Sequence, residues 1–215
     1  MAKQLLISVR ITVILLLIVS GVYPLIVWGI SQAAFKHQAD GSLVRNAQGR
    51  VVGSALLGQN FSRAEYFQPR PSAAGSGYDP TASSGTNLGP TSDKLINGIH
   101  KPDIAKGKPD PSDFDGVKDL AAAYRKTNNL PADASVPVDA VTRSASGLDP
   151  QISPMNADLQ AARVAQARGM SLDDVKKLVA DNTQGRSLGF LGEPAVNVLT
   201  LNLALDKVHP TRATK

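Results

Sequence analysis

The sequence predicts an α+β fold in which a single N-terminal transmembrane helix precedes one mixed α/β domain with few strands. Residues 11–35 contain no charged side chain over 25 positions. As a helix rising about 1.5 Å per residue, this segment is longer than the roughly 30 Å hydrocarbon core of a bilayer. After residue 36, helix-capping patterns recur, whereas few segments have the composition of strands. These observations together set the fold class.

The charges around the apolar segment predict its orientation. Lys3 and Arg10 lie before it, and basic residues favour the cytoplasmic side of a membrane. We therefore expect residues 1–10 to be a cytoplasmic arm, residues 11–35 the transmembrane helix, and residues 37–215 an extracytoplasmic domain. The expected location is the bacterial cytoplasmic (inner) membrane, crossed once.

A cleaved signal peptide is the competing interpretation, because Ser31-Gln32-Ala33 is a tolerable cleavage pattern. Signal peptides, however, have apolar regions of only about 7 to 15 residues, so a retained anchor is favoured. Gly21 and Pro24 lie well inside the segment. They are either tolerated there or mark where the helix packs closely on a neighbouring helix, and we predict the second.

Strand signals occur at two places in the remainder. Residues 42–57 predict a hairpin with its turn at Asn46 to Gly49, where glycine can adopt a positive φ. The segment AVNVLTL, residues 195–201, is the most strand-like, and NLALDKV after it is expected to close the fold as a short helix.

Capping residues predict the other helices. Ser, Thr and Asp favour helix starts, proline favours the first helical position, and glycine favours the position after the last turn. The expected helices begin at Thr91 or Ser92, cover residues 117–126, run from Ser153 to Arg168 before Gly169, and follow Ser171, with Asp174 completing a capping box. Residues 101–116 are rich in Lys, Asp, Pro and Gly and predict a polar, solvated insertion.

The longest predicted loop is residues 66–90, which opens with YFQPRPSAAGSGYDP. Its prolines restrict the residues before them, so this loop is stiffer than its glycine content suggests. Loops of this length inside a compact domain are uncommon and are often functional. What this loop serves is therefore the main functional question that the sequence raises.

Composition excludes several chemistries. The chain of 215 residues has no cysteine, which rules out disulfides and thiolate chemistry. The isolated His37, His100 and His209 make a poor zinc set, and no nucleophile motif accompanies them. The net charge of +5 lacks the charge blocks of a nucleic-acid binder. We expect no metal site, no tightly bound cofactor and no nucleic-acid partner.

Six segments in matching order resemble the C subunit of the Kdp-type potassium-transporting ATPase. The resemblance spans nearly the whole chain, including the N-terminal apolar segment, and only the 101–116 insertion departs from the family pattern. The segments are GSALLGQNF (53–61), YFQPRPSA (66–73), SSGTNLGPTS (83–92), SASGLDPQISP (144–154), RVAQARG (163–169) and VNVLTLNLALD (196–206).

The resemblance implies a non-catalytic accessory subunit of a high-affinity ATP-driven potassium importer. Its partners would be a channel-like A subunit, a P-type ATPase B subunit and a small F peptide. The role we favour is assembly with the A subunit and potassium entry at the extracytoplasmic face. The alternative is a catalytic chaperone that raises the ATP affinity of the B subunit, with ATP bound only through the complex. An anchored hydrolase or solute-binding protein is a remote third possibility.

The resemblance also nominates residues. A rigid polar and aromatic surface would serve contact with partners, and the SASGLDP turn would fix the loop. For Asn87 and the serines of that turn, a purely structural role is nearly as well supported. The partner-binding candidates are Tyr66, Phe67, Arg70, Tyr78 and Asn87, with Gly21 and Pro24 in the membrane helix, and the loop-fixing candidates are Ser144, Ser146, Gly147 and Asp149.

Overall fold

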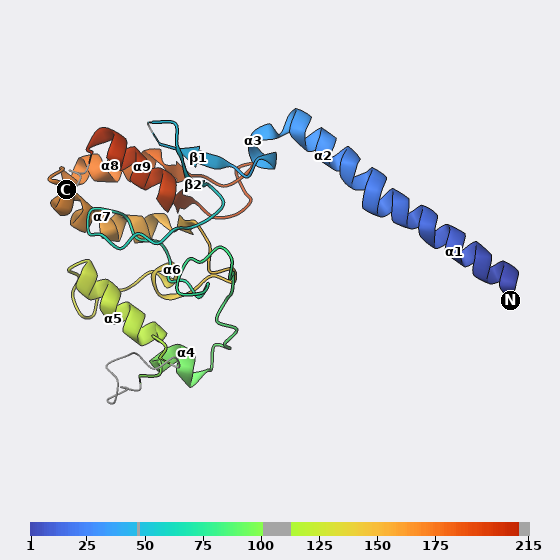
Figure 1. Ribbon diagram of the computed structural model, residues 1–215. Coiled ribbons are helices and arrows are strands. Elements are labelled where there is room, and N and C mark those ends of the chain that lie inside the picture. The colour runs from blue at the N-terminus through green and yellow to red at the C-terminus, as the bar shows by residue number, and fades with distance from the viewer. Residues whose placement is uncertain (47, 101–112, 211–215) are drawn as a thin grey trace. The chain divides into compact units, whose positions relative to one another are not determined.

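The computed structural model describes residues 1–46, 48–100 and 113–210 and divides the chain into two compact units, Met1–Leu43 and Val44–Lys215 (Figure 1). Most of the predicted 101–116 insertion, residues 101–112, therefore lies outside the described residues.

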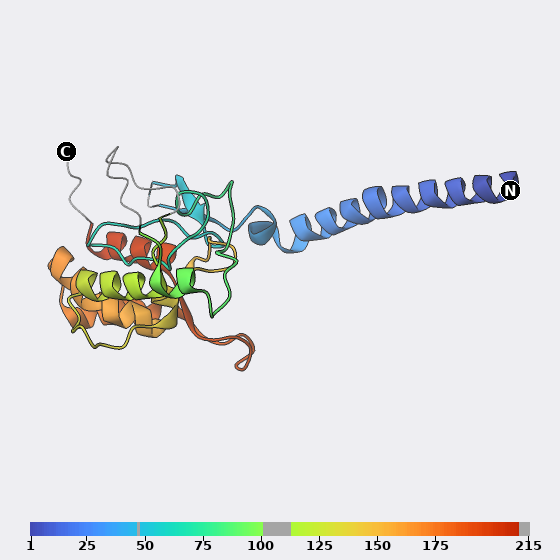
Figure 2. The same ribbon diagram turned by 90° about the horizontal axis from the view of Figure 1, so that it is seen from below.

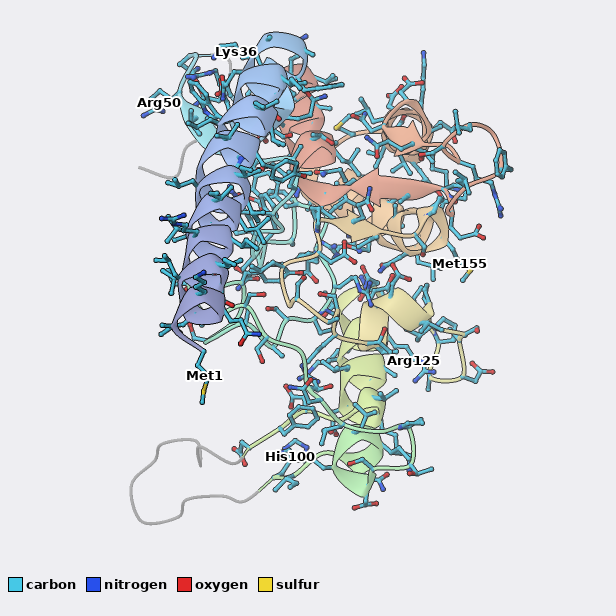
Figure 3. All side chains as sticks on the ribbon, turned by 90° about the vertical axis from the view of Figure 1, so that its right-hand side faces the viewer. Met1, Lys36, Arg50, His100, Arg125 and Met155 are labelled. Atoms are coloured by element: carbon cyan, nitrogen blue, oxygen red, sulfur yellow. The ribbon has the colours of Figure 1, made fainter. Side chains whose placement is uncertain are left out.

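The first unit is dominated by one long apolar helix. It consists of α1 (Ala2–Leu17), the π-helical turn η1 (Ile18–Val22) and α2 (Tyr23–Ala34), and a short α3 (Lys36–Ala39) follows. Met1 and Lys36 mark its two ends in Figure 3, where side chains extend on every side of it. Its 33 residues are long and apolar enough to cross a membrane, as predicted, and the helix begins at Ala2 rather than at residue 11.

The π turn lies at Gly21 and next to Pro24, the two residues for which the sequence predicted close packing on a neighbouring helix. The Tyr23 N–H donates to the carbonyl of Ile18, five residues earlier, and Pro24, which has no N–H, follows within the first turn of α2. Gly21 lies inside this turn, and a Cβ added there would meet no atom within 4 Å. A widened turn with an open glycine gives the helix a place where another backbone can approach closely.

The second unit begins with the predicted hairpin. Strands β1 (Leu43–Arg45) and β2 (Val51–Ser54) form a two-stranded sheet. The Asn46 side chain accepts hydrogen bonds from the N–H groups of Gln48 and Arg50, and Gly49 has a φ of 75°. An Asx turn followed by a left-handed glycine thus closes the hairpin.

The predicted helix starts are confirmed by their side-chain caps. Ser92 caps α4 (Asp93–Asn97), Ser153 caps α7 (Pro154–Arg168), and Ser171 caps α8 (Leu172–Asp181), each accepting a backbone N–H three residues on. Gly169 ends α7 with a φ of 66°. Two further helices of the second unit are α5 (Val117–Thr127), which was also predicted, and the short α6 (Val138–Val141).

The prediction of a strand over residues 195–201 is wrong in its second half. Strand β5 covers only Ala195–Asn197, and α9 (Val198–Val208) follows without a loop. The reason is local, because the Asn197 side chain accepts the Thr200 N–H and so starts a helix at Val198. The β-branched and apolar residues after it then form the buried face of a helix instead of a strand.

A small antiparallel sheet lies beside these helices. Its strand order is β3 (Gln151–Ile152), β5, β4 (Thr183–Gln184), with Ile152 opposite Val196 and Gln184 opposite Ala195. Helices α7, α8 and α9 pack together with β5 (Figure 1). Their apolar faces form the core, joined by one residue of the long loop: Phe67, Ile152, Ala157, Ala161, Val164, Ala165, Val175, Val179, Val196, Val198, Leu201 and Leu205.

Candidate functional site

The start of the 66–90 loop is held by two carboxamide side chains. Phe67 donates its N–H to Oδ1 of Asn202 at 2.8 Å and accepts from Nδ2 of the same residue at 2.9 Å. Gln68 pairs in the same way with Gln160, its N–H donating at 2.7 Å and its carbonyl accepting at 3.0 Å. Two consecutive residues thus have both backbone polar groups satisfied by side chains of α9 and α7, although no strand lies beside them.

The Phe67 ring enters the core, where its side chain is 0% exposed. The prediction that Phe67 belongs to an exposed aromatic surface is therefore wrong. A phenyl ring at this position stabilises the fold more when it is buried among aliphatic side chains than when it is exposed to water.

Tyr66 lies half-buried between two guanidinium groups. The guanidinium carbons of Arg63 and Arg168 lie 5.0 and 4.9 Å from its ring centroid, and its hydroxyl donates to Asp206 at 3.1 Å. Arg168 also ion-pairs with Asp206 at 2.9 Å and donates to the carbonyl of Glu65 at 2.7 Å. Cation–π contacts and hydrogen bonds together fix Tyr66 to the ends of α7 and α9.

Arg163 is a buried cation that donates to neutral carbonyl and carboxamide oxygens. Its guanidinium donates to the carbonyls of Ala64 and Tyr66 at 2.5 and 3.0 Å, to Asn128 at 2.9 Å and to Gln160 at 2.8 Å. Burial lowers the pKa of Arg163, because desolvation disfavours its charged form. Four hydrogen bonds compensate for that desolvation and bind the chain just before Phe67 to α7.

Arg70 reaches the SASGLDP turn of its own chain. Its Nη1 lies 2.7 Å from Oδ2 of Asp149, and its other nitrogens lie 3.4 Å from the carbonyl and hydroxyl oxygens of Thr142. Tyr78 donates its hydroxyl hydrogen to the Arg70 carbonyl at 2.5 Å. Burial, followed by the nearby Asp149 charge, raises the pKa of Tyr78, so the hydroxyl remains a donor.

The serines of the turn complete this internal contact. Ser144 accepts the N–H of Gly147, and Ser146 accepts the N–H of Leu148 and offers its carbonyl to Ser84. Ser72 donates to the Gly147 carbonyl at 2.6 Å. A Cβ on Gly147, whose φ is 68°, would lie 2.6 Å from the Ser84 carbonyl, so glycine lets the two loops meet. Ser144, Ser146, Gly147 and Asp149 thus all contact the 66–90 loop or shape the turn that does.

Two candidates in this loop have left-handed backbones. Tyr78 has a φ of 59° and Asn87 a φ of 53°. This conformation is common for asparagine but unfavourable for a bulky residue such as tyrosine. The hydrogen bonds of Tyr78 to Ser72 and Arg70 hold it there, whereas Asn87 is exposed.

A shallow groove of about 370 Å³ lies beside this loop. Its walls include Arg70, Tyr78, Leu120 and Tyr124. Tyr124 donates to Asn156 at 2.8 Å, and burial raises its pKa. The Arg70 guanidinium and the Tyr78 and Tyr124 hydroxyls in this groove are therefore already bonded within the chain, which suits a scaffold better than a reaction centre.

Among the described residues, His100, Asp115 and Asp119 form a group whose candidate ligand atoms lie within 4.8 Å of one another. His100 Nε2 lies 3.0 Å from Asp119 Oδ2, and the same oxygen accepts the Gly116 N–H at 2.8 Å. The group is exposed or half-buried and is already an ion pair across the start of α5. It therefore needs no cation to explain its geometry.

The sequence did not single out the side chains that hold the loop. Asn202, Gln160, Arg163 and Arg168 lie on the buried faces of α7 and α9, where apolar residues are the rule. Polar side chains at these positions of the helices are a signal in the sequence, because buried polar groups are almost always hydrogen-bonded. Isolated polar residues on an otherwise apolar helix face therefore indicate that a neighbouring segment needs hydrogen-bond donors and acceptors.

The chain thus has one helix that is long and apolar enough to cross a membrane, followed by a mixed α/β unit, which are the features of a candidate single-span membrane protein. The family model for KdpC, described as "K+-transporting ATPase, c chain", matches residues 5–207. The chain belongs to this KdpC family.

Curated relatives agree over nearly the full length. The potassium-transporting ATPase KdpC subunit of Mycobacterium tuberculosis (strain ATCC 25618 / H37Rv) is 52% identical over 97% of this chain and 100% of the relative. The subunit of the same name from Koribacter versatilis is 45% identical over 98% and 97%, and that from Caulobacter vibrioides (strain ATCC 19089 / CIP 103742 / CB 15) is 51% identical over 90% and 87%. The family expected from the sequence motifs is thus confirmed.

Proposed function

We propose that this chain is a non-catalytic accessory subunit of a high-affinity ATP-driven potassium import complex, where it supports assembly with the channel-like A subunit and potassium entry. The observation that carries the proposal is the extent of the family match, residues 5–207, which takes in both the apolar helix and the mixed unit. The hydrogen bonds and ion pairs that hold the 66–90 loop to the rest of the chain add support. They stabilise a rigid shape, and they pair Arg70 with Asp149.

The remaining partners in this proposal are the P-type ATPase B subunit and the small F peptide. Lys3 and Arg10 favour a cytoplasmic N-terminus, which would put the mixed unit on the extracytoplasmic face. In that orientation the unit is on the opposite side of the membrane from ATP. In this proposal the mixed unit therefore does not bind ATP directly.

The orientation can be tested with single engineered cysteines, because the chain has none of its own. Val138→Cys places a thiol at an exposed position of the second unit, and Gln4→Cys places one near the N-terminus while Lys3 and Arg10 remain. A membrane-impermeant thiol reagent added to intact cells should label the Val138→Cys chain and should label the Gln4→Cys chain only after permeabilisation. The reverse pattern would overturn the proposed orientation.

The accessory role can be tested by deletion in cells that carry the other subunits. Affinity purification of the A subunit from detergent-solubilised membranes should recover this chain, and its deletion should abolish growth at limiting potassium. Full growth without the chain, or failure to recover it with the A subunit, would overturn the proposal. If deletion instead leaves the complex assembled and raises only the ATP concentration needed for half-maximal turnover, the catalytic-chaperone alternative is correct.

A further inference from the structure

The connection between β4 and β5 presents three large apolar side chains to solvent. Leu188 is 83% exposed, Phe190 68% and Leu191 50%. Figure 2 shows this connection, coloured between orange and red, projecting from the rest of the second unit. Contiguous apolar side chains on an exposed projection are unusual in a soluble surface and indicate a contact.

The tip of this connection is folded, not loose. Ser187 and Leu191 exchange backbone hydrogen bonds of 2.8 and 2.9 Å, and Gly189 donates to the Arg186 carbonyl at 3.1 Å. The strands at its base, β4 and β5, are part of the small sheet, and Val196 next to it is fully buried. The apolar side chains are therefore held on a hairpin that is rooted in the core, so little conformational entropy would be lost on binding.

Leu188 has a left-handed backbone within this hydrogen-bonded turn. Its φ is 55°, in the left-handed region that leucine rarely occupies, yet its side chain is the most exposed of the three. Asparagine or glycine would suit this turn better. An unfavourable backbone state at an exposed apolar residue indicates a use outside the chain's own fold.

The base of the tip has no net charge. Arg186 and Glu193 form an ion pair at 2.7 Å. Segments that insert into anionic membrane surfaces usually combine apolar residues with an excess of Lys and Arg, which this tip does not have. A small, neutral, preorganised apolar tip fits an apolar pocket on a protein better than it fits a lipid headgroup layer.

We infer that the tip formed by Leu188, Phe190 and Leu191 inserts into an apolar pocket on the A subunit of the potassium-transporting ATPase. This inference rests on the proposed function, since it assumes that the chain works inside that complex. It adds the specific element that makes the contact. The 66–90 loop, by contrast, is bound to the chain's own helices and to its SASGLDP turn.

The first test uses a double variant that removes apolar surface while keeping the turn. Leu188→Asn suits the left-handed backbone, and Phe190→Ser removes the ring, so the full-length protein in detergent should keep its melting temperature. Its recovery with the A subunit from solubilised membranes should fall about tenfold or more, because a few central apolar anchors dominate most interfaces. Met155→Ser is the control, since Met155 is also an exposed apolar residue, on α7 (Figure 3).

The second test replaces Phe190 with p-benzoylphenylalanine in the full-length chain and irradiates intact membranes. An adduct with the A subunit is expected, and the same replacement at Met155 should give none. Adducts only with lipid, with a second copy of this chain or with a subunit other than the A subunit, or undiminished recovery of the double variant, would overturn the inference. If wild-type chain is recovered with the A subunit in that case, the proposed function stands and only the inference fails.

Discussion

Asn202 pairs with both backbone groups of Phe67, at 2.8 Å through its oxygen and 2.9 Å through its nitrogen. Both residues are almost fully buried. The carboxamide supplies one donor and one acceptor in the arrangement that a neighbouring strand would offer, and so α9 holds an extended segment without any strand pairing. Loss of this side chain leaves a buried N–H and a buried carbonyl without partners.

We therefore expect Asn202→Ala to lower the free energy of unfolding by about 2 to 4 kcal/mol, since each orphaned buried group costs roughly 1 to 3 kcal/mol. Denaturant unfolding of the full-length protein in detergent measures this. Asn87→Gly is the control, because it removes an exposed carboxamide from a left-handed position that glycine adopts freely. Equal effects of the two substitutions would show that the Asn202 pairing does not stabilise the fold.

Arg70 and Asp149 provide a prediction with an internal comparison. Their ion pair and that of Arg186 with Glu193 both measure 2.7 Å, but the side chains are 23% and 27% exposed in the first pair and 44% and 78% in the second. Arg70→Ala should destabilise the protein by about 1 to 3 kcal/mol, whereas Arg186→Ala should change stability by less than about 1 kcal/mol. Thermal unfolding of the two variants side by side gives the comparison.

The same Arg70→Ala protein can also be tested for recovery with the A subunit. A stability loss with normal recovery would mean that Arg70 serves only the fold. A loss of recovery larger than that of Asp149→Asn, which breaks the same ion pair, would support the predicted role of Arg70 in partner binding.

His100 and Asp119 predict a pH dependence. The hydrogen bond to Asp119 raises the pKa of His100 above 6.5, and the same bond lowers the pKa of Asp119 below 3.8. The His100 contribution to stability should be fully present below the unfolded-state pKa of about 6.5 and should be lost as the pH rises through the higher folded-state value. At the acid end, the Asp119 contribution should be lost as the pH falls through its lowered pKa.

An NMR titration of the His100 imidazole in the full-length protein checks this prediction. In the Asp119→Asn variant, the pKa of His100 should move back down toward 6.5. A pKa that does not change on that substitution would mean that the ion pair does not form in solution.

The π turn predicts where the membrane helix meets a neighbour. Gly21→Leu fills the open space beside that turn and should reduce recovery with the A subunit. Gly29→Leu is matched to it, because Gly29 lies in the same helix and also has no atom within 4 Å of an added Cβ. An equal effect of the two changes would mean that the π turn has no special role.

Intact mass measurement should show that residues 1–33 are retained, and a mature N-terminus at Ala34 would show a signal peptide instead.

Local signals in the sequence predicted most elements correctly, because caps such as Ser92, Ser153 and Ser171 act within three residues of themselves. The wrong prediction at Val198 also has a local cause, because the Asn197 cap starts a helix in a segment whose composition is typical of a strand. The fastening of the long loop could not be predicted in this way. Phe67 and Asn202 are 135 positions apart, and no periodicity links an asparagine in one helix to a loop residue so distant.

The carboxamide pairing of Phe67 and Gln68 also fixes alignment. A strand in a ladder can slip by two residues and recover equivalent bonds, but here each residue meets a different side chain on a different helix, Asn202 on α9 and Gln160 on α7. A shift of one residue in one direction would bring Pro69, which has no N–H, opposite Gln160, and a shift in the other direction would put the Tyr66 hydroxyl in the apolar core. A one-residue deletion between Tyr66 and Arg70 would consequently break at least one of the two pairings, so this stretch of chain acts as a spacer of fixed length between the side chains of α7 and α9.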